Sequence, residues 1–287
     1  MNQPVTALIR QRFSCRSYTD ENVGEEQRRL FAAFLAANNS GPFATPVRFA
    51  LAIATEEDRQ ALKGLGTYGF IRGATGFIIG AVKPAPHDME DFGYLMEQAI
   101  LFATDIGLGT CWLGGSFTKS SFARKIAATR EETVPAVTSI GYIAEGGKAR
   151  DRIRRRAGSD NRLPPEELFF DRQFGRSLAP AQAGAYAEPL AMVRQAPSAS
   201  NKQPWRLIRD GDCWHFYLQR TKGYGKGSFV YWLLGLADLQ RVDMGIAMCH
   251  FELTARELGL AGRWLVNEPD IAKPGAGSEY IVTWMAE

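Results

Sequence analysis

Two arginines and a serine near the N-terminus form the first group that could do chemistry. They alternate along the stretch Arg12-Phe13-Ser14-Cys15-Arg16. In an extended or turn-like backbone, the guanidinium groups and the hydroxyl between them can converge on one oxyanion, and the planar guanidinium fork suits a phosphate. The same spacing also occurs in solvated basic loops, so the motif alone leaves both interpretations open.

A second polar group lies between two prolines in the second half of the chain. Pro197 and Pro204 have a fixed φ and no N–H to donate, so the segment between them is expected to be an ordered loop. This segment carries four short polar side chains, those of Ser198, Ser200, Asn201 and Gln203. Their donors and acceptors suit a planar ligand rich in heteroatoms. The alternative is a connection after a helix, in which the Ser and Asn side chains cap neighbouring backbone groups.

Both stretches resemble motifs of the FMN-dependent nitroreductase and flavin reductase family. Residues 197–205, Pro-Ser-Ala-Ser-Asn-Lys-Gln-Pro-Trp, resemble the loop that closes over the flavin, and the N-terminal Arg-x-Ser-x-Arg resembles the phosphate motif of that family. The resemblance implies that Arg12, Phe13 and Ser14 hold the phosphate and ribityl chain of FMN. It places Arg16 at the N1/O2 edge of the isoalloxazine, where a cation stabilises the negative charge of the reduced flavin.

The resemblance implies further contacts in the loop and after the first half of the chain. Lys148 and Arg150 match a Lys-x-Arg pattern that follows the last strand in the family and contacts the FMN phosphate. They begin a basic run, residues 148–156, which otherwise indicates a solvated face or, less often, nucleic-acid binding. The loop contacts to the flavin are implied for Pro197, Ser198, Ala199, Ser200, Asn201 and Gln203.

A glycine-rich stretch, Gly-Leu-Gly-Thr-Cys-Trp-Leu-Gly-Gly at residues 107–115, resembles the region that runs under the flavin in the family. Glycines let a backbone approach a ligand closely. By the resemblance, the backbone N–H groups of Leu113, Gly114 and Gly115 address N5 or O4 of the ring. A tight helix-to-strand turn packed by Trp112 is the alternative.

The chain also resembles itself. Pro46 aligns with Pro204 and Trp112 aligns with Trp264, each with similar neighbours, which indicates an internal repeat. In the first copy of the loop, however, Phe43 stands where Asn201 stands in the second. The first half therefore keeps the phosphate motif and the second half keeps the ring-contacting loop.

This asymmetry predicts one FMN per chain, bound between two nitroreductase-like units fused into a pseudo-dimer. The predicted fold class is α+β, with antiparallel-rich central sheets flanked by helices. The expected divisions are a first unit at residues 1–147, a basic linker and crossing arm at 148–178, and a second unit at 179–287. We expect a monomer with internal pseudo-two-fold symmetry, with a homodimer as the alternative.

Apolar periodicity predicts the elements that position these motifs. It favours a strand over residues 49–54. Two longer helices are nearly apolar all round for several turns, as buried helices are. The predicted helices span residues 4–12, 25–37, 93–106, 189–195 and 234–258.

Composition fits an ordinary globular protein of 287 residues, with 45% hydrophobic residues, 23% charged residues and a net charge of +3. The four cysteines are scattered, which favours reduced thiols over a disulfide framework or a metal site. No apolar run reaches the roughly 18 residues that a bilayer span needs, and the N-terminus lacks the apolar core of a signal peptide. We therefore expect a cytoplasmic protein with no membrane and no nucleic-acid partner.

The three histidines are isolated, and no nucleophile–base pair stands out, so no catalytic side chain is predicted and the flavin N5 would carry the hydride. The resemblance implies an FMN-dependent NAD(P)H oxidoreductase acting on nitroaromatics, quinones or flavin, with NADH or NADPH as donor. Three alternatives stay open. They are an FMN storage or sensing module with little turnover, a relative that consumes the flavin with oxygen, and a scaffold without cofactor.

Overall fold

The computed structural model describes residues 1–53, 71–114, 119–146, 158, 161–225, 237–273 and 277–287. The chain forms two compact units, Met1–Ser159 and Asp160–Glu287. The division predicted from the sequence placed residues 161–178 in a linking arm, and the structure corrects this. These residues carry a strand of the second sheet, so they are part of the second unit. Their apolar run from Leu168 to Phe170 is buried there, which explains why they fold with it.

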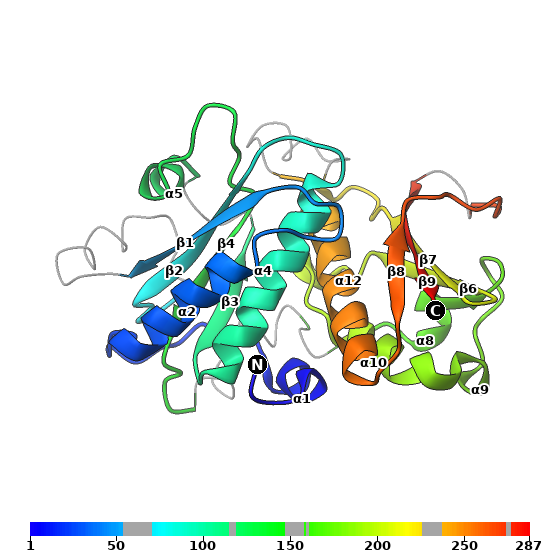
Figure 1. The fold of residues 1–287 in the computed structure, drawn as a ribbon, viewed down its shortest axis with the longest axis horizontal. Helices are drawn as coiled ribbons and strands as arrows, with labels where there is room; N and C mark the ends of the chain where they lie inside the picture. Colours follow the sequence, from blue (N-terminus) through cyan, green and yellow to red (C-terminus); the bar gives the residue numbers. More distant parts are fainter. Residues whose placement is uncertain (54–70, 115–118, 147–157, 159–160, 226–236, 274–276) are drawn as a thin grey trace. The chain divides into compact units, whose positions relative to one another are not determined.

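The first unit contains a four-stranded sheet in the order β1-β2-β4-β3, with every neighbouring pair antiparallel (Figure 1). Strand β2, one of the two central strands, is a continuous apolar run in which every residue is buried. The strands are β1 (Val47–Ile53), β2 (Gly76–Val82), β3 (Gly109–Leu113) and β4 (Val137–Gly141), and the helices are α1 (Val5–Gln11), α2 (Glu25–Ala37), α4 (Asp88–Asp105) and α5 (Lys119–Lys125).

Helix α4 organises the core of the first unit, because it contacts α1, α2 and three of the four strands. Phe34 of α2 stacks on Phe102 of α4 with ring centroids 4.2 Å apart. On another part of the sheet, Phe77 meets the edge of Phe122. Full burial of an aromatic side chain of this size contributes about 1.5–3 kcal/mol, so the first contact helps to hold α2 on α4 and the second helps to hold α5 on β2.

The second unit contains a five-stranded sheet in the order β5-β6-β7-β9-β8, in which β5 is parallel to β6 and the other pairs are antiparallel. Its strands are β5 (Phe169–Asp171), β6 (Trp205–Asp210), β7 (Cys213–Gln219), β8 (Gly262–Leu265) and β9 (Ser278–Ala286). Its helices are α8 (Pro165–Leu168), α9 (Pro180–Ala183), η1 (Gly184–Tyr186), α10 (Ala187–Gln195), η2 (Ala199–Asn201) and α12 (Leu239–Glu257).

The two sheets share one strand order. The run β6-β7-β9-β8 repeats the run β1-β2-β4-β3, and a long helix lies in sequence between β2 and β3 (α4) and between β7 and β8 (α12). This is the order that two related units would have. The descent of both units from one duplicated ancestor stays a prediction.

Most predicted elements are confirmed, with one physical correction. Helix α2 has the predicted bounds, and α1, α10 and β1 differ from theirs by a few residues. The two long helices are not nearly apolar all round, because they bury carboxylates, among them Asp91 and Glu97 in α4 and Asp243 in α12. Each of these accepts hydrogen bonds inside its unit, which offsets the cost of burial. None of the described helices is long and apolar enough to cross a membrane.

Candidate functional site

The stretch that carries the two arginines runs beside strand β3. Helix α1 ends at Gln11, and the N–H of Arg12 makes the last helical bond, to the carbonyl of Leu8 at 2.9 Å. The chain then extends, because Ser14 forms a parallel bridge with Thr110 and the N–H of Cys15 donates to the carbonyl of Thr110 at 2.8 Å. The structure therefore has the extended backbone that convergence on one oxyanion requires.

Arg12 is held inside the first unit and not in a solvated loop. Its side chain is 7% exposed, and its Nε lies 3.6 Å from Oε1 of Glu97, which is 0% exposed. The other carboxylate oxygen of Glu97 accepts a hydrogen bond from Trp112 Nε1 at 2.8 Å. The structure thus connects Arg12 to the glycine-rich stretch around Trp112 through a residue of α4.

The rest of the first motif is half-buried. Arg16 Nη1 lies 3.4 Å from the carbonyl of Ser14, so the second arginine folds back over the backbone of its own segment. Phe13 and Ser14 are also half-buried. Tyr18 fixes the far end of the segment, since its hydroxyl bonds the carbonyl of Cys15 and Ser139 Oγ, each at 2.8 Å.

The structure describes the glycine-rich stretch as far as Gly114. Leu113 is the last residue of β3, and its side chain packs in a core cluster with Phe77 and Val137. The expected contact of the Leu113 backbone N–H with the flavin stays a prediction. Gly114 is half-buried. Three predicted site residues lie outside the described part of the chain: Gly115, Lys148 and Arg150.

The loop between Pro197 and Pro204 is ordered and strained. Ser200, Asn201 and Gln203 have φ values of 51°, 54° and 49°, in the left-handed region that residues with a Cβ seldom adopt. Each such residue costs of order 1 kcal/mol or more and persists only where its surroundings enforce it. The predicted ordered loop is confirmed.

Three hydrogen bonds enforce the loop conformation from its own neighbourhood. The N–H of Ala199 donates to Asp243 Oδ1 at 2.9 Å, and the N–H of Gln203 donates to Ser198 Oγ at 2.9 Å. The exposed Ser200 shares a hydrogen bond of 3.1 Å with the hydroxyl of Tyr224. The tip of the loop is therefore presented outward while its base is tied to α12.

The amides of Asn201 and Gln203 bind a segment of the same unit, residues 161–163. Arg162 Nη1 donates to Asn201 Oδ1 at 3.0 Å, and Asn201 Nδ2 donates to the carbonyl of Asn161 at 2.9 Å. The N–H of Leu163 donates to Gln203 Oε1 at 2.9 Å. Gln203 is 3% exposed, so this conformation does not support a ring contact by its side chain. The predicted ring contacts of the other loop residues stay predictions.

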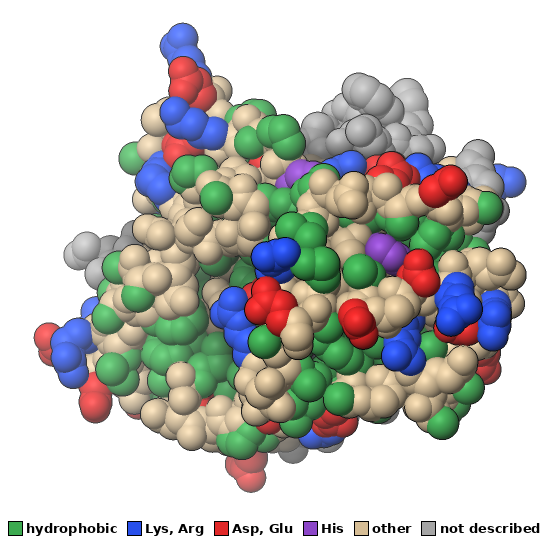
Figure 2. All heavy atoms as spheres, turned by 45° about the vertical axis from the view of Figure 1, so that its right-hand side comes forward, with side chains coloured by type: hydrophobic (Ala, Val, Ile, Leu, Met, Phe, Trp, Pro, Cys, Tyr) green, Lys and Arg blue, Asp and Glu red, His purple; other side chains and the backbone are tan. Residues whose placement is uncertain are grey.

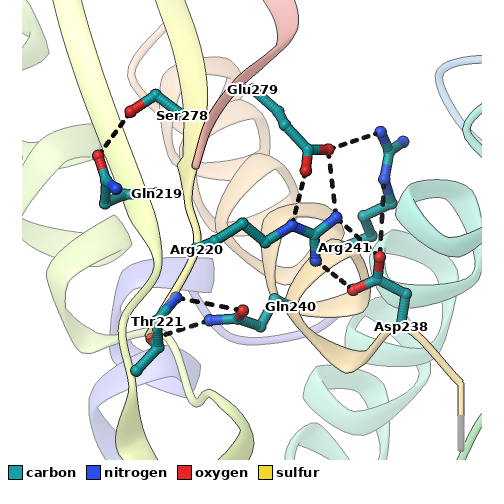
Figure 3. A network of polar contacts seen from close by, with 8 residues as sticks. All are labelled: Gln219, Arg220, Thr221, Asp238, Gln240, Arg241, Ser278 and Glu279. Carbon is teal, nitrogen blue, oxygen red and sulfur yellow. Dashed lines mark hydrogen bonds and ion pairs between the residues drawn. The ribbon is translucent and has the colours of Figure 1, made fainter. Parts of the chain in front are cut away.

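A network of charged side chains braces the start of α12 (Figure 3). Arg220, which follows β7, binds Asp238 with Nη1–Oδ1 and Nη2–Oδ2 distances of 2.5 and 2.8 Å. Its Nε lies 2.7 Å from Glu279 Oε1 in β9, and Arg241 Nη2 lies 3.1 Å from Glu279 Oε2. Burial opposes ionisation of Glu279, yet the two guanidinium groups hold its pKa below the usual value. The network ties β7, β9 and α12 together next to the loop.

Comparison with known proteins decides the family. A family model described as "Putative TM nitroreductase" matches residues 4–255. The chain belongs to this nitroreductase family. A comparison with curated proteins found no match.

Several solved nitroreductase structures are similar to this chain, and the first of them shares its fold. A putative nitroreductase from Thermotoga maritima MSB8 has a TM-score of 0.62 at 18% identity, with 99% of this chain and 94% of that chain covered. A putative nitroreductase from Desulfovibrio desulfuricans, in complex with FMN, is 27% identical over 51% of this chain and 90% of that chain, with a TM-score of 0.42. A nitroreductase with bound FMN from Desulfitobacterium hafniense is 17% identical over 50% and 90%, with a TM-score of 0.42.

In this member of the nitroreductase family, sequence reasoning missed the buried carboxylates that hold the two segments. One signal could have revealed a pair of them. Asp91 and Asp243 are separated by the same number of residues as Trp112 and Trp264, so the internal repeat aligns them as it aligns the tryptophans. A charge that recurs at one position in both copies is a candidate for a shared tertiary contact.

On the face shown in Figure 2, acidic and basic side chains are interspersed. The described part of this face has no continuous basic surface, whereas nucleic-acid binding needs clustered Lys and Arg. The basic run at residues 148–156 lies outside the described residues. The expectation that the chain has no nucleic-acid partner stays a prediction.

Proposed function

We propose that this chain is an FMN-dependent oxidoreductase of the nitroreductase type, with NADH or NADPH as donor. The acceptor would be electron-poor: a nitroaromatic, a quinone or a flavin. The single observation that carries the proposal is the buried Arg12, which is paired with Glu97 at the start of an extended Arg-x-Ser-x-Arg segment in a chain of this family. A guanidinium is seldom held at 7% exposure unless it has a structural or binding task.

The donor set of the first unit fits the phosphate of FMN. Arg12 supplies a guanidinium whose Nε faces Glu97, so that its Nη groups remain for an anion. Ser14 supplies a half-buried hydroxyl in the same extended segment. Arg16 supplies a second cation, which the family resemblance assigns to the N1/O2 edge of the ring. When bound, FMN would supply hydride transfer, and these residues would hold and orient it.

The donor set of the second unit fits a flat polar ring through backbone and hydroxyl groups. The loop holds Ser200 outward in a left-handed conformation, with its base tied to Asp243. We assign the phosphate to the first unit and the ring loop to the second, with one FMN per chain. We further propose a cytoplasmic enzyme that is a monomer or a homodimer.

One observation favours a second function, an FMN module with little turnover. The amides of Asn201 and Gln203 are used within the unit, which leaves fewer polar groups to tune a flavin. The experiment that separates the two functions loads the purified chain with FMN and adds excess NADH or NADPH without oxygen. Loss of the oxidised flavin absorbance, restored by an added quinone or nitroaromatic, is the result expected of the enzyme. A flavin that stays oxidised would contradict it.

A further inference from the structure

We propose that Glu97 is a positioning residue for the phosphate-binding guanidinium of Arg12, and that Trp112 fixes Glu97 for this task. The inference rests on the proposed function and names a residue that the family resemblance did not. Three side chains from three parts of the first unit carry it: Arg12 after α1, Glu97 in α4 and Trp112 in β3.

The two oxygens of Glu97 have separate partners. Oε2 accepts the indole N–H of Trp112 at 2.8 Å, and Oε1 lies 3.6 Å from Nε of Arg12. An indole has a single N–H in a fixed direction, so this bond holds Oε2 in place. With Oε2 held by Trp112, Oε1 is the oxygen that faces Arg12.

The ion pair also sets which edge of the guanidinium is left for a ligand. Arginine presents its N–H donors in a rigid planar fork. The Nε atom of Arg12 is buried beside Glu97, so Nη1 and Nη2 are the groups that can reach an anion. The backbone bond from Cys15 to Thr110 holds the segment of Arg12 to the strand of Trp112. All three side chains are therefore fixed relative to one another.

In the described residues of the second unit, a Trp–Glu pair recurs beside an exposed arginine. Trp264 Nε1 donates to Glu252 Oε2 at 2.7 Å, as Trp112 does to Glu97. The arginine beside Glu252 is Arg256, one turn along α12, with Nη2 2.5 Å from Glu252 Oε1 and a side chain that is 64% exposed. The Trp–Glu bond by itself is thus a packing feature of both units, and the buried arginine is what the first unit adds.

The charge of Glu97 decides the expected effect of its substitution. Glutamine keeps an oxygen for Trp112 but places an uncharged amide beside Nε of Arg12. Without the ion pair to Glu97, the guanidinium of Arg12 is no longer held in one orientation, so its hydrogen bond to a phosphate weakens. We expect Glu97→Gln to reduce affinity for FMN about tenfold to a hundredfold, as for the loss of one charged hydrogen bond. Riboflavin, which lacks the phosphate, should bind equally to both proteins.

The test uses the full chain and titrates FMN and riboflavin into the wild type, Glu97→Gln and the matched control Glu252→Gln, with flavin fluorescence as readout. The ratio of FMN to riboflavin affinity should fall in Glu97→Gln and stay at the wild-type value in Glu252→Gln. A merely structural role would lower both affinities together, so an unchanged ratio in Glu97→Gln overturns the inference.

A second pair of variants protects the test against a failure of Glu97→Gln to fold. Trp112→Phe removes the indole N–H and keeps an aromatic side chain, so it should lower the affinity ratio by less than Glu97→Gln, while Trp264→Phe should leave it unchanged. An unchanged ratio in Trp112→Phe would count against the inference. If the wild type binds FMN more tightly than riboflavin and the variants keep the same affinity ratio, the inference is overturned but the proposed function is not. A wild type that binds neither flavin removes the proposed function and this inference with it.

Discussion

The loops that precede the first long strand of each unit are tied by equivalent carboxylates in different ways. In the first unit, Asp91 accepts the N–H groups of Phe43 at 3.0 Å and Thr45 at 2.7 Å, one on each oxygen. In the second unit, Asp243 accepts the N–H of Ala199 on Oδ1, while its buried Oδ2 has no hydrogen-bond partner in the described part of the chain. The anchor is kept in both units, and the bonds it makes differ.

The side chains on the two loops explain the difference. Phe43 stacks on His87 with ring centroids 4.2 Å apart, so the first loop is closed by aromatic packing. The second loop has polar residues in left-handed conformation and uses Ser198 to satisfy the N–H that Asp91 satisfies in the first. The comparison teaches that two loops held by carboxylates at equivalent positions can carry different side chains, aromatic in the first unit and polar in the second.

The largest effect is expected on FMN affinity when an arginine of the first unit is substituted, compared with an arginine of the second unit. Arg12→Ala should weaken FMN binding at least a hundredfold, because one or two charged hydrogen bonds to the phosphate are lost at about 1.5–3 kcal/mol each. Arg176→Ala in the second unit removes an arginine that is paired with Asp171 and should leave FMN affinity unchanged. Equilibrium titration with FMN measures both. Equal losses in the two variants would contradict the assignment of the phosphate to the first unit.

A smaller effect is expected from substitution of the two anchoring carboxylates, Asp243 and Asp91, which should differ in their effects on FMN affinity and on stability. Asp243→Ala leaves the N–H of Ala199 without its acceptor and releases the loop, so FMN affinity should fall about tenfold. Asp91→Ala removes two acceptors and should cost about 2–4 kcal/mol of unfolding free energy, with little change in FMN affinity. Denaturant unfolding and FMN titration on both variants check this crossed pattern. It would be contradicted if Asp91→Ala lost more affinity than Asp243→Ala.

Asp243, the anchor of the second loop, should make the free energy of unfolding fall as pH rises, whereas Glu279 in the charged network should make it fall as pH drops. Burial raises the pKa of Asp243 well above its usual 3.8, opposed only in part by the N–H of Ala199. A carboxyl that holds its proton more tightly when folded contributes most stability below pH 3.8 and loses that contribution as pH rises through the raised pKa. Asp243→Asn should remove this loss. Unfolding free energies measured at rising pH should fall less in the variant, and parallel curves would refute the assignment.

The smallest expected effect compares an ion pair that follows β2 in the first unit with one that follows β7 in the second. In the second unit the lowered pKa of Glu279 contributes stability above its usual 4.5, which is lost as pH falls through the lowered pKa. Glu279 is partly exposed, so after solvent screening Glu279→Gln should cost about 1 kcal/mol at neutral pH and less in acid. Glu131, paired with Lys83 in the first unit, is mostly exposed, and Glu131→Gln should have almost no effect. Thermal unfolding at two pH values tests both, and equal shifts would contradict the comparison.

Local patterns in the sequence were enough for much of the fold. Helix α2 could be predicted because its apolar residues recur at helical spacing and a stop signal, Asn-Asn-Ser-Gly-Pro, follows it. The prolines of the second loop were enough to predict that it is ordered. The sequence allowed either an extended or a turn-like backbone between Arg12 and Arg16. The pairing of this segment with Thr110 shows that it is extended.

The contacts that hold the candidate site could not be predicted in the same way. A carboxylate such as Glu97 in an apolar helix is usually assigned to a solvent-facing side, whereas its contacts with Arg12 and Trp112 help to explain its burial. The amide of Asn201 was expected on a ligand, but it bonds Asn161 and Arg162, far earlier in the chain. Hydrogen bonds between distant segments leave no periodic signal in a sequence.

The most direct test of the account is the amount of FMN that the chain binds. Purified protein is saturated with FMN, freed of unbound flavin and denatured, and the released FMN is measured per mole of chain. One unit with the phosphate motif and one unit with the ring loop predict one FMN per chain. Two FMN per chain would show that each unit carries a complete site, and none would show that the buried arginine has no flavin to bind.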